Sequence, residues 1–316
     1  MKKIIAILLF TVPMVLSAQS NGGYAGSFLR MGLGARGQSL GNAGIADQTS
    51  GYSFYYNPAL TAFTEKKIIS LSSSSMSLDR HTNYIGFSMK APPDAGFSLG
   101  WINSGVGELY QYNSVGETQG KMDHSINAAY FNVARPIGSK LAIGLSIKYL
   151  WESIDFGSEK YLSSGLGWEF GTIYRINEDL NVAFVLRDVS SKLKASTSKI
   201  FEHGGTTIDE FPITYVLGIR YITPYKWLRV LYDFETSDNE AHKNHIGLEA
   251  VYREAVAIRG GYDHDRVTFG AGINFMALKT TKESLLGYLG MLNYAFLPSR
   301  YDEGSSHIFS WQIYLD

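Results

Sequence analysis

The sequence predicts an all-β protein, an antiparallel transmembrane β-barrel of about 14 strands with an N-terminal plug segment. The first observation is a period of two, clearest from Val267 to Phe275, where Val, Phe, Ala, Ile and Phe alternate with Thr, Gly, Gly and Asn. A strand with one apolar and one polar face has this pattern. Because the pattern recurs along most of the chain, it indicates a barrel that is apolar outside and polar in its lumen.

The second observation is the number and spacing of the strand candidates. They are 66–77, 82–90, 94–103, 125–135, 141–152, 164–176, 179–188, 212–222, 227–236, 243–252, 255–262, 266–276, 286–296 and 306–316. Connections after even-numbered candidates, such as 135–140 and 223–226, are short, whereas those after odd-numbered candidates, such as 103–124 and 187–211, are long. Short periplasmic turns and long outer loops are typical of outer-membrane barrels, so both termini are expected in the periplasm. The short connection 263–265 is the exception.

The third observation is the last segment, which alternates in a way that suits barrel closure. One face carries apolar residues and the other polar ones: Phe309, Trp311, Ile313 and Leu315 against Ser310, Gln312 and Tyr314. The 33 Gly, 21 Tyr and 17 Phe fit aromatic girdles and a lumen of small residues. A soluble β-sandwich shares this composition, but it has no reason to sort loop lengths by parity.

Residues 1–18 have the features of a secretory signal peptide. Lys2 and Lys3 precede the apolar stretch 4–16, and Ser17-Ala18 forms a small-residue cleavage site. The alternative is a transmembrane anchor, but the apolar stretch contains Pro13 and is shorter than the roughly 20 residues of a spanning helix. We therefore expect export to the bacterial outer membrane.

The charge and the cysteine content exclude nucleic-acid binding and several kinds of site. Without Lys2 and Lys3 the chain has 26 basic and 29 acidic residues, which gives no basic footprint for nucleic acid. The absence of cysteine excludes disulfides, thiolate nucleophiles, cysteine metal sites and a lipoprotein anchor.

The mature N-terminus differs from the rest of the chain, and we expect residues 19–65 to form a plug or periplasmic segment, with the barrel in 66–316. Gly32, Gly34 and Gly37 match the dinucleotide-binding spacing. That chemistry needs a strand before the glycines and a helix after them, and neither is visible. The glycines are better explained as positions where an irregular segment passes through a narrow space.

No catalytic residue, metal site or cofactor is predicted. The polar runs 242–245 and 263–265 contain histidine and aspartate, but both are expected in solvated turns, and no third ligand is placed by sequence. There is no Gly-x-Ser-x-Gly elbow, so a surface hydrolase stays only a third hypothesis.

Charged residues inside predicted strands are candidates for a lumenal charge ladder. They are Arg220, Arg229, Asp233, Glu249 and Arg259. A basic residue on the lipid face at mid-depth costs roughly 2–4 kcal/mol, so such residues face the lumen or pair. The alternative is that some lie near the rims and meet water or headgroups.

The Asn57-Pro58-Ala59 element predicts a fixed turn. Pro58 fixes its own backbone and biases Asn57 away from helix, and the Asn57 side chain can bond to nearby backbone. The element would end the plug and lead into the first strand, either as an ordinary turn or as part of a gate.

Several of these stretches resemble a known family. Residues 28–36, 40–47 and 56–59, with the later pair 258–263 and 267–272, resemble the PorV/PorQ family of outer-membrane proteins. The Asn-Pro-Ala element is shared with the wider group of FadL-like channels, which are fourteen-stranded barrels with an N-terminal plug. The resemblance makes these residues the candidate plug or gate motif: Arg36, Asp47, Asn57, Pro58 and Ala59.

The resemblance implies two non-enzymatic functions. A PorV/PorQ-like protein would serve type IX secretion by binding exported cargo or the translocon, and it would use loops such as 103–124 and 187–211. A FadL-like channel would take up fatty acids or other hydrophobic small molecules through a continuous apolar cavity beside residues 28–60. The expected partners are outer-membrane lipid with either secretion-system proteins or a hydrophobic small molecule.

Overall fold

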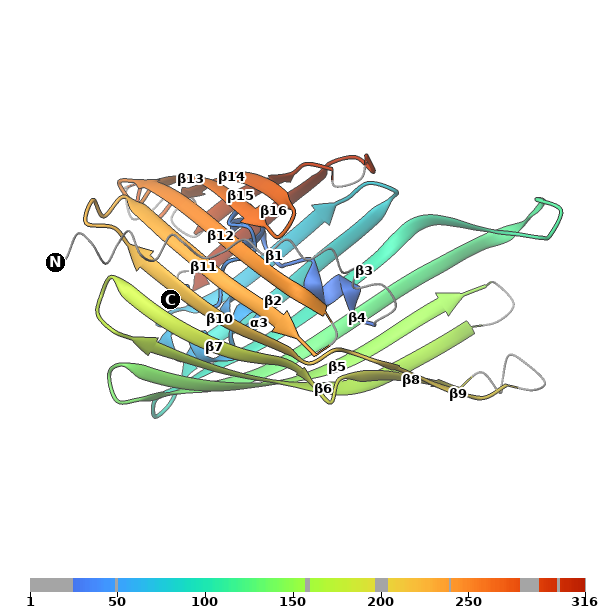
Figure 1. Cartoon of the computed structure of the whole chain (residues 1–316), viewed down its shortest axis with the longest axis horizontal. Coiled ribbons are helices and arrows are strands. Elements are labelled where there is room, and N and C mark those ends of the chain that lie inside the picture. The colour runs from blue at the N-terminus through green and yellow to red at the C-terminus, as the bar shows by residue number, and fades with distance from the viewer. Residues whose placement is uncertain are drawn as a thin grey trace.

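The computed structural model describes residues 25–48, 51–156, 160–196, 204–238, 240–278, 290–299 and 302–315. Within them, fourteen antiparallel strands close into a barrel (Figure 1), which confirms the predicted antiparallel β-barrel. The barrel strands are β1 (Lys67–Ser75), β2 (Arg80–Ala91), β3 (Ala95–Tyr112), β4 (Thr118–Ile137), β5 (Leu141–Asp155), β6 (Lys160–Arg175), β7 (Leu180–Val189), β10 (Thr214–Ile222), β11 (Leu228–Ser237), β12 (Glu240–Tyr252), β13 (Val256–Asp263), β14 (Arg266–Asn274), β15 (Met291–Leu297) and β16 (Ser306–Leu315). The barrel closes where β1 pairs with β16, from Lys67 opposite Leu315 to Ser75 opposite His307.

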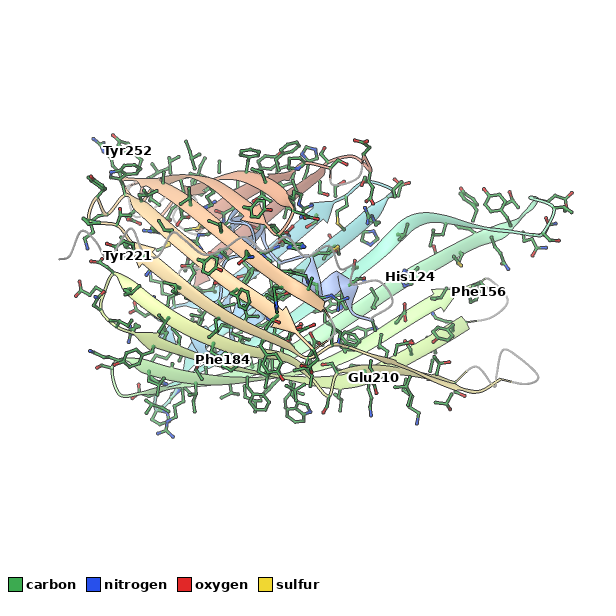
Figure 2. All side chains as sticks on the ribbon, in the orientation of Figure 1. His124, Phe156, Phe184, Glu210, Tyr221 and Tyr252 are labelled. Carbon is green, nitrogen blue, oxygen red and sulfur yellow. The ribbon has the colours of Figure 1, made fainter. Side chains whose placement is uncertain are left out.

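The outer surface of the barrel is apolar because the side chains alternate as the sequence predicts. In β14, Val267 and Phe269 are exposed while Thr268 is buried. Large apolar side chains cover the outside around the barrel (Figure 2), among them Leu99, Phe131, Phe184, Leu217, Ile258 and Phe309. Exposed aromatic residues, Tyr221, Tyr225, Trp227 and Tyr252, lie at the end that carries the short turns. This distribution suits a lipid-facing band with an aromatic girdle.

Two segments that were predicted as long loops contain strands. Residues 103–124 are mostly strand, because β3 and β4 continue as a paired ribbon that projects beyond the neighbouring strands (Figure 1). A ribbon outside the membrane has no lipid-facing side, so both of its faces are polar. The sequence of this segment therefore lacks the alternation of apolar and polar residues that predicts a strand. Residues 187–211 contain a short hairpin, β8 (Lys192–Ser196) and β9 (Thr206–Glu210), while β7 pairs directly with β10.

Three further expectations either differ from the structure or lie partly or wholly outside the described residues. The run 242–245 lies within β12 rather than in a turn, and His245 is buried. Candidate strand 286–296 corresponds to β15, which begins at Met291, and residues 279–289 lie outside the described residues. The predicted signal peptide, residues 1–18, also lies outside them.

Residues 25–48 and 51–64, which we call the lumenal segment, pack against the inward faces of the strands. The segment contains η1 (Ser27–Arg30), α2 (Ala35–Ser39), α3 (Ser53–Tyr56) and η2 (Pro58–Phe63). None of the described helices is long and apolar enough to cross a membrane. Aromatic residues of the segment form a core with the inward faces of β2 to β5: Phe28, Tyr52, Phe54 and Tyr55 with Tyr84, Ile102, Tyr130 and Leu150.

Candidate functional site

The lumenal segment follows a path that only small residues allow. Gly34 has a φ of 73°, a conformation that other residues rarely adopt. A side chain at Gly37 would have its Cβ 2.1 Å from the Tyr56 hydroxyl. These two positions account for the glycine spacing near residue 34 by backbone packing, as predicted, and no strand precedes them among the described residues.

The Asn57-Pro58-Ala59 element is fixed at the wall of the barrel. The Asn57 side chain accepts a hydrogen bond from the Ala59 amide at 2.9 Å and donates to the carbonyls of Ile45 at 2.9 Å and Thr172 at 3.1 Å. Pro58 begins η2, whose last residue lies four positions before β1. The element therefore ties the segment to itself and to β6, and it turns the chain toward the first strand.

Arg36 and Asp47, the other two candidate gate residues, contact each other inside the barrel. Arg36 donates to both carboxylate oxygens of Glu249 on β12, at 3.0 and 2.8 Å, and it pairs with Asp47. Bidentate arginine–carboxylate pairs are among the strongest and most directional hydrogen-bonded pairs. Arg36 therefore ties α2 to a barrel strand 213 residues away in sequence.

Four of the five predicted ladder charges join this cluster. Glu249 stands between two arginines on adjacent strands, Arg229 at 3.2 Å and Arg259 at 2.7 Å. Arg220 on β10 approaches Asp47 at 3.6 Å. These residues, with Arg36, form what we call the arginine cluster: Arg36, Asp47, Arg220, Arg229, Glu249 and Arg259. Arg229 alone also reaches the rim, where it binds Glu254.

Asp233, the fifth predicted charge, lies apart from the cluster. Its carboxylate accepts hydrogen bonds from the backbone amides of Gly44 at 2.7 Å and Ile45 at 3.0 Å. It therefore holds the bend that follows α2, and all five predicted charges contact the lumenal segment or the inward network.

Asp47 should hold the lumenal segment over a wide pH range. Burial raises the pKa of this carboxyl, but the nearby guanidiniums of Arg36 and Arg220 outweigh burial and keep the pKa below its ordinary value of 3.8. A depressed pKa means that the stabilisation is complete above the unfolded value and is lost as the pH falls through the folded one.

We therefore expect amide exchange in residues 35–39, which Arg36 joins to Asp47, to be unchanged from pH 7 to about pH 4 once the intrinsic exchange rate is corrected, and to rise only below that. Hydrogen–deuterium exchange with mass spectrometry measures this. Loosening between pH 7 and pH 5 would contradict the assignment of Asp47 as an ionised tether.

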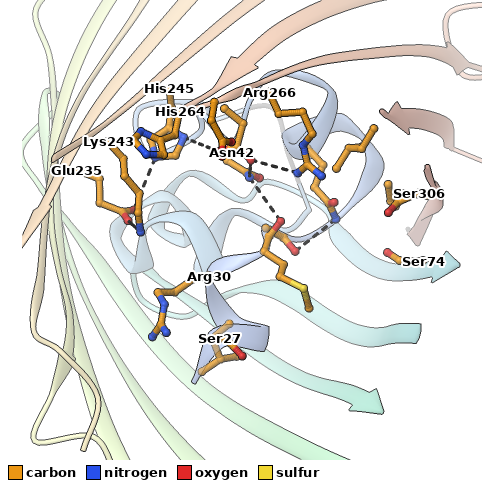
Figure 3. A pocket seen from close by; sticks show the side chains of 18 of the residues that line it. Ser27, Arg30, Asn42, Ser74, Glu235, Lys243, His245, His264, Arg266 and Ser306 are labelled. Atoms are coloured by element: carbon orange, nitrogen blue, oxygen red, sulfur yellow. Dashed lines mark hydrogen bonds and ion pairs between the residues drawn. The ribbon is translucent and has the colours of Figure 1, made fainter. Parts of the chain in front are cut away.

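A cavity of about 480 Å³ lies beside the lumenal segment (Figure 3). Its lining reaches Met76, Ser77, Pro298 and Gly304, at the end opposite the short turns. Apolar side chains from the segment and the wall line part of it: Leu29, Met31, Tyr55, Met76 and Ile308. Charged side chains line another part of it, among them Arg30, Arg187, Glu235, Lys243, His245 and Asp263. The expectation of a continuous apolar cavity is therefore wrong, because β7, β11, β12 and β13 point charges inward.

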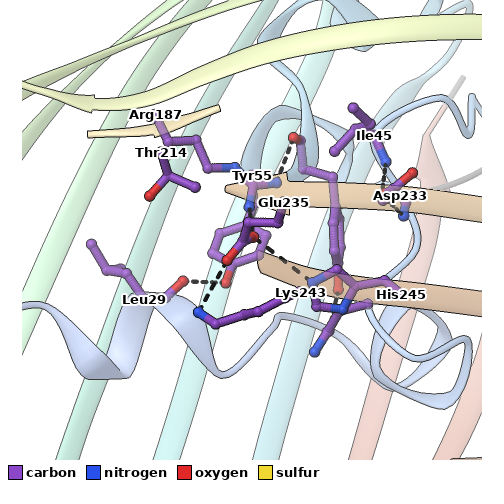
Figure 4. A network of polar contacts seen from close by, with 12 residues as sticks. Leu29, Ile45, Tyr55, Arg187, Thr214, Asp233, Glu235, Lys243 and His245 are labelled. Atoms are coloured by element: carbon purple, nitrogen blue, oxygen red, sulfur yellow. Dashed lines mark hydrogen bonds and ion pairs between the residues drawn. The ribbon is translucent and has the colours of Figure 1, made fainter. Parts of the chain in front are cut away.

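The charged wall of the cavity is an ordered network (Figure 4). One carboxylate oxygen of Glu235 accepts a hydrogen bond from Lys243 Nζ at 3.2 Å. The other carboxylate oxygen lies 3.6 Å from Arg187 Nη1. Arg187 also donates to the backbone carbonyl of Tyr56 at 2.8 Å, and His245 contacts Asp263 at 3.0 Å. Lys243, His245 and Asp263 were expected in solvated turns, and Arg187 and Glu235 were not among the predicted site residues. Their signal was available, since Glu235, Lys243 and His245 occupy the polar positions of two alternating strands.

No metal centre emerges from the described part of the chain, which holds no group of three or more histidine, aspartate or glutamate side chains able to bind one. The Nδ1 atom of His245 instead contacts the Asp263 carboxylate at 3.0 Å and the carbonyl of Gly41 at 2.9 Å.

The described strands form a closed barrel with an apolar outer surface, which is the architecture of transmembrane β-barrels. No family model matches the sequence, and no curated protein matches it. Among solved structures, the toluene transporter TbuX of Ralstonia pickettii is similar with a TM-score of 0.63 at 14% identity, over 90% of this chain and 99% of that chain. A FadL homologue of Pseudomonas aeruginosa has a TM-score of 0.62 at 9% identity, over 90% of this chain and 98% of that chain.

The toluene transporter TodX of Pseudomonas putida gives a TM-score of 0.58 at 13% identity, over 89% of this chain and 96% of that chain. At these identities the similarity concerns the fold alone, and this chain shares the fold of these three proteins. None of the three structures is a PorV/PorQ protein, and that resemblance stays a prediction.

Proposed function

We propose that this protein is an outer-membrane channel for small molecules that combine an apolar body with polar groups. The observation that carries the proposal is the cavity beside the lumenal segment, where Leu29, Met31 and Tyr55 face a wall of paired charges. The fold shared with hydrocarbon transporters and the apolar outer band support a transport role in the outer membrane. The paired charges favour an amphipathic molecule over a pure hydrocarbon, because a hydrocarbon would displace water from these charged groups without offering hydrogen bonds in return.

The lumenal segment would act as the gate of this channel. It separates the cavity from the short-turn end of the barrel, where Arg229 and Glu254 lie. A molecule that leaves the cavity toward the periplasm has to displace part of the segment. Arg36, Asp47 and Asn57 tie that segment down, so they are the proposed gate residues.

A role in type IX secretion is the second candidate. The observation that favours it is the projecting ribbon of β3 and β4, which exposes Tyr110, Tyr112 and Val115 at its tip. Exposed aromatic side chains at a loop tip suit contact with a protein partner.

Purification of the tagged barrel from outer membranes in mild detergent, with mass spectrometry of bound proteins and small molecules, separates the two functions. We expect a stoichiometric amphipathic small molecule in the wild type, and less of it after Lys243→Met, which removes a charge from the cavity wall. The matched control is Lys226→Met, at the exposed Asp179 pair. Translocon components or exported proteins without a small molecule would contradict the channel and support secretion.

A further inference from the structure

A groove of about 520 Å³ lies on the outer wall of the barrel, over β4, β5 and β6. Five of the residues that line it are Ala129, Tyr149, Trp151, Leu162 and Ser164. Tyr149 and Trp151 point outward, because Leu150 between them is fully buried. The other three share this face, since each stands directly opposite an outward position of β5. The groove therefore opens toward the surroundings of the barrel and not toward its lumen.

The groove lies where the apolar outer surface gives way to polar side chains. Asn127, which stands opposite Trp151, accepts hydrogen bonds from the Asn103 amide at 2.9 Å and from the Trp101 indole at 3.1 Å. The rings of Tyr149 and Trp151 stack at the same level, with their centroids 5.5 Å apart. Tryptophan and tyrosine gather where the hydrocarbon of a membrane meets its headgroups. This combination of amides and aromatic rings therefore marks the edge of the lipid-facing band.

The length of β5 places the groove at the same edge. Trp151 lies ten residues after Leu141, where β5 begins beside a short turn. At about 3.4 Å per residue this is about 34 Å of strand, which a tilt of about 45° reduces to about 24 Å of height. The apolar band of an outer-membrane barrel is about 25 Å tall, and its short turns face the periplasm. Trp151 therefore reaches the headgroups of the outer leaflet.

An exposed lysine, Lys194 on β8, stands beside the groove. It lies opposite Ser164, and the two share the outward face because the adjacent pair, Ala195 opposite Ser163, is buried. The other cross-strand neighbour of Lys194 is the uncharged Ile208, and no ion pair joins Lys194 to another described residue. The groove thus has an ammonium group at its edge.

The other lysines near this edge differ from Lys194, because they already face carboxylates. Lys160 lies 4.0 Å from Asp155, and Lys192 stands opposite Glu210, at the place labelled in Figure 2. At headgroup level the phosphates of membrane lipids supply negative charge, and they attract lysine side chains near the surface. Lys194 therefore has the position and the charge to bind a lipid phosphate.

We infer that this groove is a docking site for an anionic, phosphate-bearing lipid of the outer leaflet. An acyl chain of the lipid lies in the groove against Tyr149 and Leu162, and its phosphate binds Lys194. The groove shares no lining residue with the cavity of Figure 3, so the lipid site is separate from it. The inference depends on the barrel lying in a membrane and is independent of the proposed channel.

Native mass spectrometry of the delipidated barrel in detergent tests the role of the charge. The barrel is titrated with phosphatidylglycerol or with phosphatidylcholine of the same acyl chains, which differ in net charge. We expect the first molecule of phosphatidylglycerol to bind several-fold more tightly. Lys194→Gln should remove this preference, whereas the matched control Lys140→Gln, an exposed lysine beside a short turn, should keep it. Equal binding of the two lipids to the wild type, or an unchanged preference in Lys194→Gln, would overturn the inference.

A substitution inside the groove tests the place of the acyl chain in the same titration. Ala129→Leu fills part of the groove and should weaken phosphatidylglycerol binding several-fold. The matched control is Ala271→Leu, at an exposed outward position of β14 that does not line the groove, and it should bind the lipid like the wild type. Equal phosphatidylglycerol binding by these two variants would mean that the lipid does not use the groove, and would overturn the inference.

Discussion

Glu249→Ala should release the lumenal segment and strongly destabilise the barrel interior. Glu249 is the shared partner of Arg36, Arg229 and Arg259, so its loss leaves three guanidiniums at one level without their common carboxylate. Removing one member of a buried ion pair costs about 3–5 kcal/mol, because the remaining charge stays desolvated. We expect faster hydrogen–deuterium exchange in residues 35–47 and a lower urea midpoint in detergent micelles.

The control for this change is Asp179→Ala, which removes the exposed pair with Lys226. Surface ion pairs contribute only about 0–1 kcal/mol, so that variant should match the wild type closely. Adding Arg36→Ala to Glu249→Ala should recover part of the lost stability, since one of the orphaned cations is then removed. If Glu249→Ala behaves like Asp179→Ala, the arginine cluster does not hold the segment.

Gly144→Val should displace the turn at Asn57-Pro58-Ala59 and open the pore. The missing Cβ of Gly144 would stand 2.4 Å from the Ala59 amide nitrogen and from the Pro58 carbonyl carbon. Both are backbone atoms, and backbone cannot turn aside as a flexible side chain can, so η2 has to move away from β5. We expect a several-fold rise in single-channel conductance in planar bilayers, with the barrel still folded.

Gly260→Val is the matched control for this conductance measurement. It places the same side chain on a barrel strand where a Cβ meets nothing within 4 Å, so conductance should stay at the wild-type level. An equal rise in both variants would mean that valine disturbs the barrel wall in general. No rise in either would mean that the lumenal segment does not limit passage.

The strands could be predicted from sequence because each one faces two different solvents. In β16, for example, Phe309 lies on the outer face and Ser310 on the inner one, so burial repeats with a period of two. The extension of β3 and β4 beyond the membrane could not be predicted in this way. There both faces meet water, and the alternation that marks a strand disappears.

The site was predictable only in part, for a similar reason. Glu249 and Arg259 stand out because a charge on a membrane strand has to face inward. The contact of Arg36 with Glu249 joins residues 213 positions apart, and no local pattern encodes it. The charged wall at Glu235 and Lys243 was overlooked because both lie close to the strand ends, where solvated charges are expected.

A disulfide that locks the lumenal segment to the barrel tests the gate most directly. The chain contains no cysteine, so Ala35→Cys with Ser310→Cys introduces a single pair, at positions where the Ala35 amide and the Ser310 hydroxyl lie 3.0 Å apart. Uptake of radiolabelled decanoate by cells that depend on this barrel is measured before and after reduction. We expect no uptake when the pair is oxidised and recovery on reduction. Equal uptake in both states would contradict a channel gated by this segment.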